Sequence, residues 1–336
     1  MDKNQQILAA RLQEIATMEQ QLGENHPDVA DSYADLSHIC RNMVRFPEAL
    51  AYLQKAIAIR EKVLAPDHHN LIIAYNNIAQ IYQDMGRLPE ALAYQQKNIS
   101  IREKKLGKNH PDLANSYSNL SLIYKDIAQF PEALAYQQKA IAIREKVLDK
   151  NHPDIATSYS NLSIIYQAMR QFSEALAYQQ KAIIMRENAL NKNPHELAAS
   201  YNNMASIFLK MGKLMEALIF QQKAVSIYQQ TLPKNHPELA NSYNNISVVY
   251  QKMKQFAKAM AYQHKAIAIR EQILDNNHPN LATSYGNMAY LYYETKQINQ
   301  AKDYIARAVA ILKHNFPNGH PNLTTMLHIQ EHINKT

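Results

Sequence analysis

Histidine is the side chain with the widest range of chemistry in this sequence, and it occurs 14 times in 336 residues. An imidazole can bind zinc or transfer protons near neutral pH. Six His-Pro dipeptides, at intervals of 42 or 84 residues, begin at His26, His110, His152, His236, His278 and His320. Equivalent residues of stacked helical units lie roughly 10 Å apart, too far to share an ion whose ligands stand at about 2.1 Å. We therefore expect these histidines to mark the starts of helices and expect no metal site.

Two other arrangements could suggest catalysis. His328, Glu331 and His332 match the H-x-x-E-H pattern of a class of zinc peptidases, but that enzyme needs a third ligand well downstream and only four residues follow His332. Cys40 is two residues from His38, which on a helix separates the two side chains by about 200°. No glycine-rich phosphate loop is present. We expect a protein that is not an enzyme, with no catalytic residues and no cofactor.

Charge and hydropathy exclude further classes of protein. The formal net charge of +7, from 36 basic and 29 acidic residues, is small for this length and does not require a nucleic acid partner. The N-terminus is polar, and no segment approaches the run of about 18 to 20 apolar residues that a membrane-spanning helix needs. A single cysteine fits a reducing compartment. The sequence predicts a cytoplasmic protein that contacts neither membrane nor nucleic acid.

A repeat of 42 residues organises the whole chain. Seven tyrosines keep this spacing without an insertion: Tyr33, Tyr75, Tyr117, Tyr159, Tyr201, Tyr243 and Tyr285. Since 336 / 42 = 8, the chain is eight unit lengths of one motif. One copy therefore describes the local structure expected of the others.

Each copy contains two amphipathic segments, which the fourth copy shows at 153–166 and 173–186. In the first segment, Ile155, Tyr159, Leu162 and Tyr166 follow one another at steps of three or four, the period of one helical face. Pro153 suits the first turn of a helix, where a missing N–H costs nothing. The connection at 170–172 is too short for anything but an antiparallel hairpin. The sequence thus predicts a stack of helical hairpins.

This pattern resembles the tetratricopeptide repeat, whose signature the fourth copy supplies as Tyr159, Leu162, Ser163, Tyr166, Phe172, Ala175 and Ala182. The usual unit has 34 residues, and the 42-residue length looks like the variant of kinesin light chains. The resemblance implies an all-α, right-handed superhelical solenoid of antiparallel helix hairpins with about seven full repeats. We expect a single solenoid over 1–336, with a half-repeat helix at 4–22, seven hairpins over 28–316 and a half-repeat or capping helix at 321–334.

A stripe of asparagines runs along the first helices, on positions that packing does not use. Counting the repeated tyrosine as position four, position six is Asn77, Asn119, Asn161, Asn203, Asn245 and Asn287. The resemblance implies that this face lines the inner, concave surface and that its asparagines contact the backbone of a peptide. An amide both donates and accepts, so a ladder of Asn can hold an extended peptide without reading its sequence. The alternative is that each Asn bonds the neighbouring hairpin.

Residues beside the asparagines would select the partner. Position nine includes Leu122, Ile164, Val248 and Tyr290, and positions twelve and thirteen include Arg41, Lys125, Lys210 and Lys252. The mixture indicates a peptide segment with an apolar anchor and some acidic residues. The alternative for each charge is that it simply belongs to a solvated face.

The second helices carry polar residues at positions that should be buried. Gln95, Gln137, Gln179, Gln221 and Gln263 recur four residues after an alanine. A buried amide needs a partner, so we expect these glutamines to bond each other or nearby tyrosine hydroxyls. Arg144 also points toward the packed face, and we expect an ion pair with an acid of the adjacent loop or hairpin, for instance Asp154. Lys97, Lys139, Lys181, Lys223 and Lys265 are expected to face outward into solvent.

The functional hypothesis is a protein-binding adaptor that captures an extended or partly helical segment in the Asn-lined groove. Two alternatives stay open. Near-identical copies could stack end to end, giving a self-assembling scaffold through the solenoid ends. The repeats could also be the sensory part of a larger signalling protein.

Overall fold

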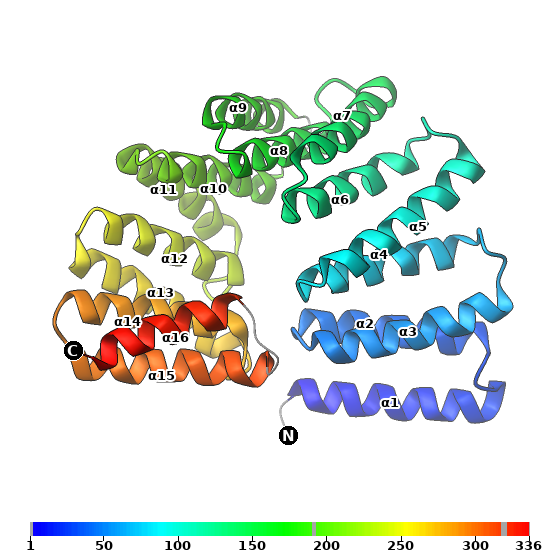
Figure 1. The fold of residues 1–336 in the computed structure, drawn as a ribbon, viewed down its shortest axis with the longest axis horizontal. Coiled ribbons are helices and arrows are strands. Elements are labelled where there is room, and N and C mark those ends of the chain that lie inside the picture. The colour runs from blue at the N-terminus through cyan, green and yellow to red at the C-terminus, as the bar shows by residue number, and fades with distance from the viewer. Residues whose placement is uncertain (1–2, 190–192, 317–320, 336) are drawn as a thin grey trace. The chain divides into compact units, whose positions relative to one another are not determined.

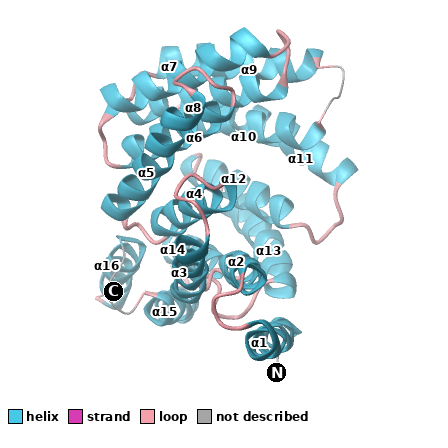
Figure 2. Ribbon diagram, turned by 90° about the vertical axis from the view of Figure 1, so that its right-hand side faces the viewer, coloured by secondary structure: helices cyan, strands magenta, loops and turns pink. Residues whose placement is uncertain are grey.

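Helices form all the regular structure of the described residues, which are 3–189, 193–316 and 321–335 of the computed structural model (Figures 1 and 2). The first helices of the hairpins are α2 (Pro27–Asn42), α4 (His69–Asp84), α6 (Asp112–Asp126), α8 (Pro153–Ala168), α10 (Pro194–Lys210), α12 (Pro237–Lys252) and α14 (Pro279–Glu294). The second helices are α3 (Phe46–Val63), α5 (Leu88–Leu106), α7 (Phe130–Val147), α9 (Phe172–Asn188), α11 (Leu214–Thr231), α13 (Phe256–Ile273) and α15 (Ile298–Asn315). One further helix stands at each end, α1 (Lys3–Leu22) and α16 (Pro321–Asn334). The predicted all-α solenoid of seven hairpins with half-repeat helices is confirmed.

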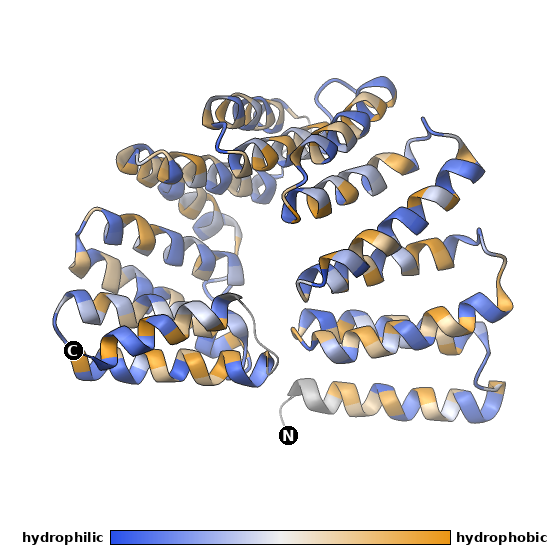
Figure 3. Ribbon diagram, in the orientation of Figure 1, coloured by the Kyte–Doolittle hydropathy of each residue, from blue (hydrophilic) through white to orange (hydrophobic). Residues whose placement is uncertain are grey.

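The chain divides into two compact units, residues 1–170 and 171–336, and each is described by itself. The helices are amphipathic, with apolar and polar stripes along most of them (Figure 3). Alanines allow close packing between helices, because Ala49, Ala133 and Ala140 in the first unit and Ala259 and Ala266 in the second have no exposed surface. The buried faces therefore follow the period that the sequence shows.

The repeated histidines begin the first helices. In His26, His152, His236 and His278, Nδ1 accepts a hydrogen bond from the backbone N–H two residues later, at 3.1–3.2 Å. His110 makes the same bond to Asp112. In α10 the side chain of Asn193 replaces the imidazole and accepts from the N–H of His195 at 3.1 Å. The prediction that the histidines mark helix starts is confirmed, except that His320 lies outside the described residues.

One of these caps should make stability depend on pH. Burial, together with the positive charge of Arg270, lowers the pKa of His278. A group with a lowered pKa in the folded state stabilises the fold above its unfolded pKa of about 6.5, and this contribution is lost as pH falls through the folded pKa. Protonation also removes the Nδ1 acceptor of a cap worth about 1 kcal/mol.

We expect His278→Asn to remove this part of the pH dependence, because asparagine is an uncharged cap that α10 already uses. Thermal melting of both proteins at pH 7 and pH 5 measures the difference. The wild type should lose more stability than the variant, by about 1 kcal/mol. Equal losses in the two proteins would show that His278 does not carry the effect.

The partners of the buried glutamines differ from those expected. Gln95, Gln137 and Gln179 are almost completely buried, and each Nε2 donates to a backbone carbonyl in the first helix of the next hairpin, at 2.9–3.1 Å. Gln263 makes the same bond to Ser284 and a second one to Asn244, and Gln221 donates to Asn202. The prediction that they bond each other or tyrosine hydroxyls is wrong, because the nearest acceptors are those of the adjoining first helices.

The buried arginines connect three helices each. Arg144 donates to Asn115 in its own hairpin and to Ser158 in α8, so the expected ion pair with Asp154 is replaced by neutral acceptors. Arg270 does the same with Asn241 at 2.7 Å and with Ser284 at 2.5 Å. Arg60 does form an ion pair, with Asp31 at 2.6 Å. Burial lowers the pKa of Arg144, and it lowers that of Arg270 to about 10.

The two end helices carry polar residues where complete hairpins carry packing residues. In α1, Arg11 and Glu14 occupy the places of Leu53 and Ala56 and form an exposed ion pair at 2.8 Å. In α16, Gln330, Glu331 and Asn334 occupy the places that hold Leu36, Ser37 and Cys40 in α2. The face that would meet the missing half of each hairpin is therefore hydrophilic.

Candidate functional site

The predicted asparagines lie on the first helices of both units, and we call their exposed surface the amide face. In the first unit it carries Asn77 of α4, Asn119 of α6 and Asn161 of α8, and in the second unit Asn203 of α10, Asn245 of α12 and Asn287 of α14. Asn77 and Asn245 are exposed, and the other four are half-buried. Every one of them thus keeps some surface at the protein boundary.

Half of the amides also join neighbouring hairpins. Asn119 Nδ2 donates to Asn76 Oδ1 and Asn161 Nδ2 to Ser118 Oγ, both at 3.0 Å. In the second unit Asn287 Nδ2 donates to Asn244 Oδ1, also at 3.0 Å. Each acceptor stands at position five of the preceding first helix. For these three residues, bonding between hairpins is therefore part of the role, and each bond uses one N–H group of the amide.

The predicted basic residues of this face fall into two groups. Arg41 Nε donates to Asp84 at 2.6 Å and its Nη1 donates to Gln80, so this guanidinium joins α2 to α4. Lys125 Nζ forms an ion pair with Oδ1 of its neighbour Asp126 at 2.7 Å. In the second unit Lys210 and Lys252 are exposed, and within the described residues neither forms an ion pair. Of these four basic residues, only the two in the second unit have no carboxylate partner among the described residues.

Apolar side chains interrupt the amide face at the predicted places. Leu122 and Ile164 in the first unit and Val248 in the second are half-buried, and 36% of Tyr290 is exposed. Burial and a hydrogen bond to Glu294 raise the pKa of Tyr290. The sequence reasoning missed Ile73, one turn before Asn77, which is 38% exposed. Position two is polar or alanine in the other complete copies, and this contrast could have identified it.

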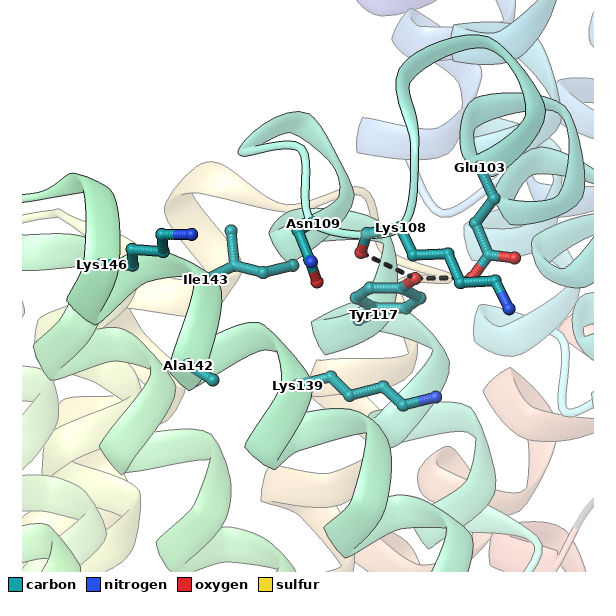
Figure 4. Close-up of a pocket in the computed structure, with 8 residues that line it drawn as sticks. All are labelled: Glu103, Lys108, Asn109, Tyr117, Lys139, Ala142, Ile143 and Lys146. Carbon is teal, nitrogen blue, oxygen red and sulfur yellow. Dashed lines mark hydrogen bonds between the residues drawn. The ribbon is translucent and has the colours of Figure 1, made fainter.

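A different feature lies on the side of the second helices. The five repeated lysines predicted to face outward are exposed, and several lie against tyrosine rings, with Lys97 Nζ 4.1 Å from the centroid of Tyr75. In the first unit, Lys139 and Tyr117 border a pocket of about 400 Å³, together with two further lysines (Figure 4). Its lining residues are Glu103, Lys108, Asn109, Tyr117, Lys139, Ala142, Ile143 and Lys146. No sequence motif marked this pocket, because its residues come from two hairpins and a loop.

The sequence model of the tetratricopeptide repeat matches residues 38–84, 70–146, 128–188, 196–271 and 240–314, well over half of the chain. The chain belongs to the tetratricopeptide repeat (TPR) family. Among curated proteins, none matches the sequence of this TPR protein. The predicted family is thereby confirmed, and four signature residues of the fourth copy are buried: Leu162, Ser163, Ala175 and Ala182.

Three solved structures are similar to this TPR protein. A putative kinesin light chain with nearly identical TPR-like repeats from Podosopora anserina shares 25% identity with a TM-score of 0.51, over 61% of this chain and 97% of that one. BtubC (BKLC) from P. vanneervenii shares 22% identity with a TM-score of 0.58, over 70% and 94%. A STAND signal transduction ATPase with a TPR sensor from Pyrococcus horikoshii shares 15% identity with a TM-score of 0.59, over 100% and 50%. The first confirms the kinesin-light-chain-like type, and the other two agree in fold.

Two kinds of feature are not found among the described residues, a cluster of metal-binding side chains and a membrane-spanning helix. Within 3–189, 193–316 and 321–335, no three His, Cys, Asp or Glu side chains gather into a group that could hold a metal ion. None of the helices described is long and apolar enough to cross a membrane. The surfaces left to explain are the amide face and the lysine-bordered pocket.

Proposed function

We propose that this TPR protein is a non-enzymatic adaptor that binds a linear peptide segment of another protein on the amide face. The observation that carries the proposal is that the amides remain partly exposed although several of them join hairpins. An amide has two N–H donors and a carbonyl with two lone pairs. Three of the amides use one N–H group in a hydrogen bond between hairpins: Asn119, Asn161 and Asn287. The second N–H group and the carbonyl of each amide remain for the backbone of a peptide.

The side chains beside the amides fit a segment with an apolar anchor and acidic residues. Ile73 in the first unit and Tyr290 in the second are exposed apolar or aromatic groups on an otherwise polar face. Their burial under a peptide would contribute roughly 25 cal/mol for each Å² removed from water. Lys210 and Lys252 would meet acidic side chains in the second unit. Arg41 is a weaker candidate than the sequence indicates, because Asp84 already pairs with it.

The amide face is best tested at Asn77 and Asn245, which are exposed and make no side-chain hydrogen bond within the described residues. We expect Asn77→Ala and Asn245→Ala each to weaken binding of a selected peptide by about two- to twelvefold, the equivalent of one net hydrogen bond. Peptides can be selected from a displayed random library on the wild-type protein, and their Kd values measured by fluorescence anisotropy. Binding in both units would make the double variant weaker than either single one.

The matched control is Gln138→Ala together with Gln180→Ala, which removes two exposed amides from second helices. This variant should bind the selected peptides as the wild type does. If the asparagine variants keep wild-type affinity, or if the glutamine control loses as much, the amide face is not the binding surface. Melting temperatures of all variants separate lost binding from lost folding.

The alternative of a scaffold that assembles through its ends finds less support. The polar faces of α1 and α16 disfavour the apolar contact that end-to-end stacking requires. End-to-end contact would also remove water from three charged side chains, those of Arg11, Glu14 and Glu331. Burying a charge costs free energy unless an opposite charge on the other copy pairs with it. The exposed apolar residues of α1 are Ile7 (42%), Leu12 (36%) and Leu22 (46%), and the charged pair of Arg11 and Glu14 lies between Ile7 and Leu22 in the sequence. The sensory alternative is compatible with the same amide face, since a signal carried by a peptide would be received there.

A further inference from the structure

The pocket of the first unit lies apart from the amide face. Glu103 comes from the end of α5, Lys108 and Asn109 from the loop before α6, and Lys139 and Lys146 from α7. Figure 4 shows Lys146 on one side of the pocket, Lys108 and Glu103 on the other, and Tyr117 and Lys139 between them. A volume of about 400 Å³ is within the range of small-molecule sites. The pocket therefore has room for a small organic group.

The charge of the pocket is unbalanced. Three lysines and one carboxylate line it, which leaves a local charge of +2 (3 − 1). Among the described residues, Lys108, Lys139 and Lys146 form no ion pair. The one carboxylate, Glu103, accepts a hydrogen bond from the hydroxyl of Tyr117 at 2.5 Å. Burial and this bond raise the pKa of Tyr117, so the hydroxyl stays a donor at neutral pH.

The same place one repeat earlier is neutral. Residues 42 positions before Lys108 and Asn109 are Pro66 and Asp67. Lys105 Nζ lies 3.0 Å from Asp67 Oδ2, and Lys97 Nζ lies 3.0 Å from Glu61 Oε1. Both carboxylates at that place are therefore paired with a lysine. Relative to Pro66 and Asp67, Lys108 adds one positive charge and Asn109 removes one negative charge, so the local charge rises by two. The Lys-Asn pair also stands at 150–151, 192–193 and 234–235, so it is the common pattern of the copies and Pro66-Asp67 is the exception.

We propose that this pocket binds a phosphate monoester. A phosphate monoester carries a charge of about −1.5 to −2 at pH 7 and three strong acceptor oxygens, which match the +2 charge and the ammonium donors. Lysine binds phosphate as a mobile point charge, and Asn109 adds an amide donor. The Tyr117 ring, Ala142 and Ile143 form an apolar wall for the organic part of the ester. That ester is either a phosphorylated side chain of a partner protein or a free phosphorylated metabolite.

The test is calorimetric titration of the full chain at one fixed ionic strength with three probes and their controls. The probes are a phosphoserine tripeptide, glucose 6-phosphate and inorganic phosphate, and the controls are the unphosphorylated tripeptide and glucose. Saturable binding is expected for at least one ester and for neither control. Asn109→Asp, which introduces the carboxylate found in the earlier repeat, and Lys146→Gln should each weaken that binding about two- to fivefold.

The matched control variant is Lys104→Gln, which removes the charge at the place equivalent to Lys146 one repeat earlier. Its affinity for the esters should equal that of the wild type. Binding of the tripeptide alone supports a phosphorylated protein partner, and binding of glucose 6-phosphate alone supports a metabolite. The proposal is overturned if no ester binds saturably at millimolar concentration, if inorganic phosphate binds as tightly as both esters, or if the control variant loses as much affinity as Asn109→Asp. Circular dichroism establishes that each variant is folded.

Discussion

Replacing Arg270 with methionine is expected to lower the free energy of unfolding by about 2 to 4 kcal/mol. Only 5% of Arg270 is exposed, and its guanidinium donates to Asn241 in α12 and to Ser284 and the carbonyl of Asn280 in α14. Methionine fills similar space and removes the charge. It leaves the acceptors at the junction of three helices without their donor, and unsatisfied buried polar groups are costly.

Urea unfolding followed by far-UV circular dichroism measures this loss, with Arg307→Met as the control. Arg307 lies on α15, is 43% exposed and pairs with Glu271 at 3.3 Å. An exposed ion pair contributes about 1 kcal/mol or less, so the control should lose little. Comparable losses in the two variants would show that the buried connections of Arg270 contribute no more than a surface pair.

The second large effect is expected from Gly286→Val, which should detach α16 from α14. A Cβ at Gly286 would lie 2.5 Å from both Sδ and Cε of Met326. Methionine is flexible enough to turn away from one methyl group, but the branched valine adds two more beside it. Overpacking of this kind costs about 1 to 3 kcal/mol. Because α16 is an end helix, the cost should be met by local opening rather than by global unfolding.

Hydrogen exchange with mass spectrometry should show amide protection in α16 falling about tenfold or more, while α2 to α4 keep theirs. Leu323 and Ile333, which are buried in the wild type, become exposed in the open form. Adding Met326→Ala to Gly286→Val should restore much of the protection, because it vacates the space that the new side chain needs. A double variant as open as the single one would place the cause elsewhere than this contact.

The hairpins themselves follow from single residues in the sequence. The spacing of Tyr159, Leu162 and Tyr166 defines one face of a first helix, and Ala175 and Ala182 allow its partner to approach. The role of His152 also follows, because a residue before proline at a helix start is in position to accept a hydrogen bond from the first turn. These features are local, so each copy predicts them independently of its neighbours.

Contacts between hairpins could not be predicted in the same way. The period shows that Gln137 and Arg144 point inward, but their partners depend on how far one hairpin is displaced along the next. That displacement places the carbonyl of Ser158 beside Gln137 and its hydroxyl beside Arg144. The partners expected from the sequence were other glutamines or tyrosine hydroxyls and an acid such as Asp154. The hydrogen bonds between hairpins on the amide face depend on the stacking in the same way. Asn119 reaches Asn76, and Asn161 reaches Ser118, only when the hairpins are stacked.

The lysine-bordered pocket was missed for another reason. Its residues lie on two second helices, one first helix and a loop, and residues such as Lys108 and Asn109 recur as Lys150 and Asn151 in the next copy, so nothing in the period distinguishes them. The volume of the pocket also depends on side-chain size at Ala142, where the next repeat has Ile184. Differences between copies therefore carry information about binding that the shared pattern does not contain.

The polar end helices restrict how such an array can change its length by duplication of a 42-residue segment. A copy inserted between two existing hairpins would find arginine, glutamine and asparagine partners on both sides. A copy joined next to α1 would meet Arg11 and Glu14 where a complete hairpin packs Leu53 and Ala56, and one joined next to α16 would meet Gln330 and Glu331. Insertion or deletion of a 42-residue segment should therefore be tolerated between existing hairpins and disfavoured beside α1 and α16.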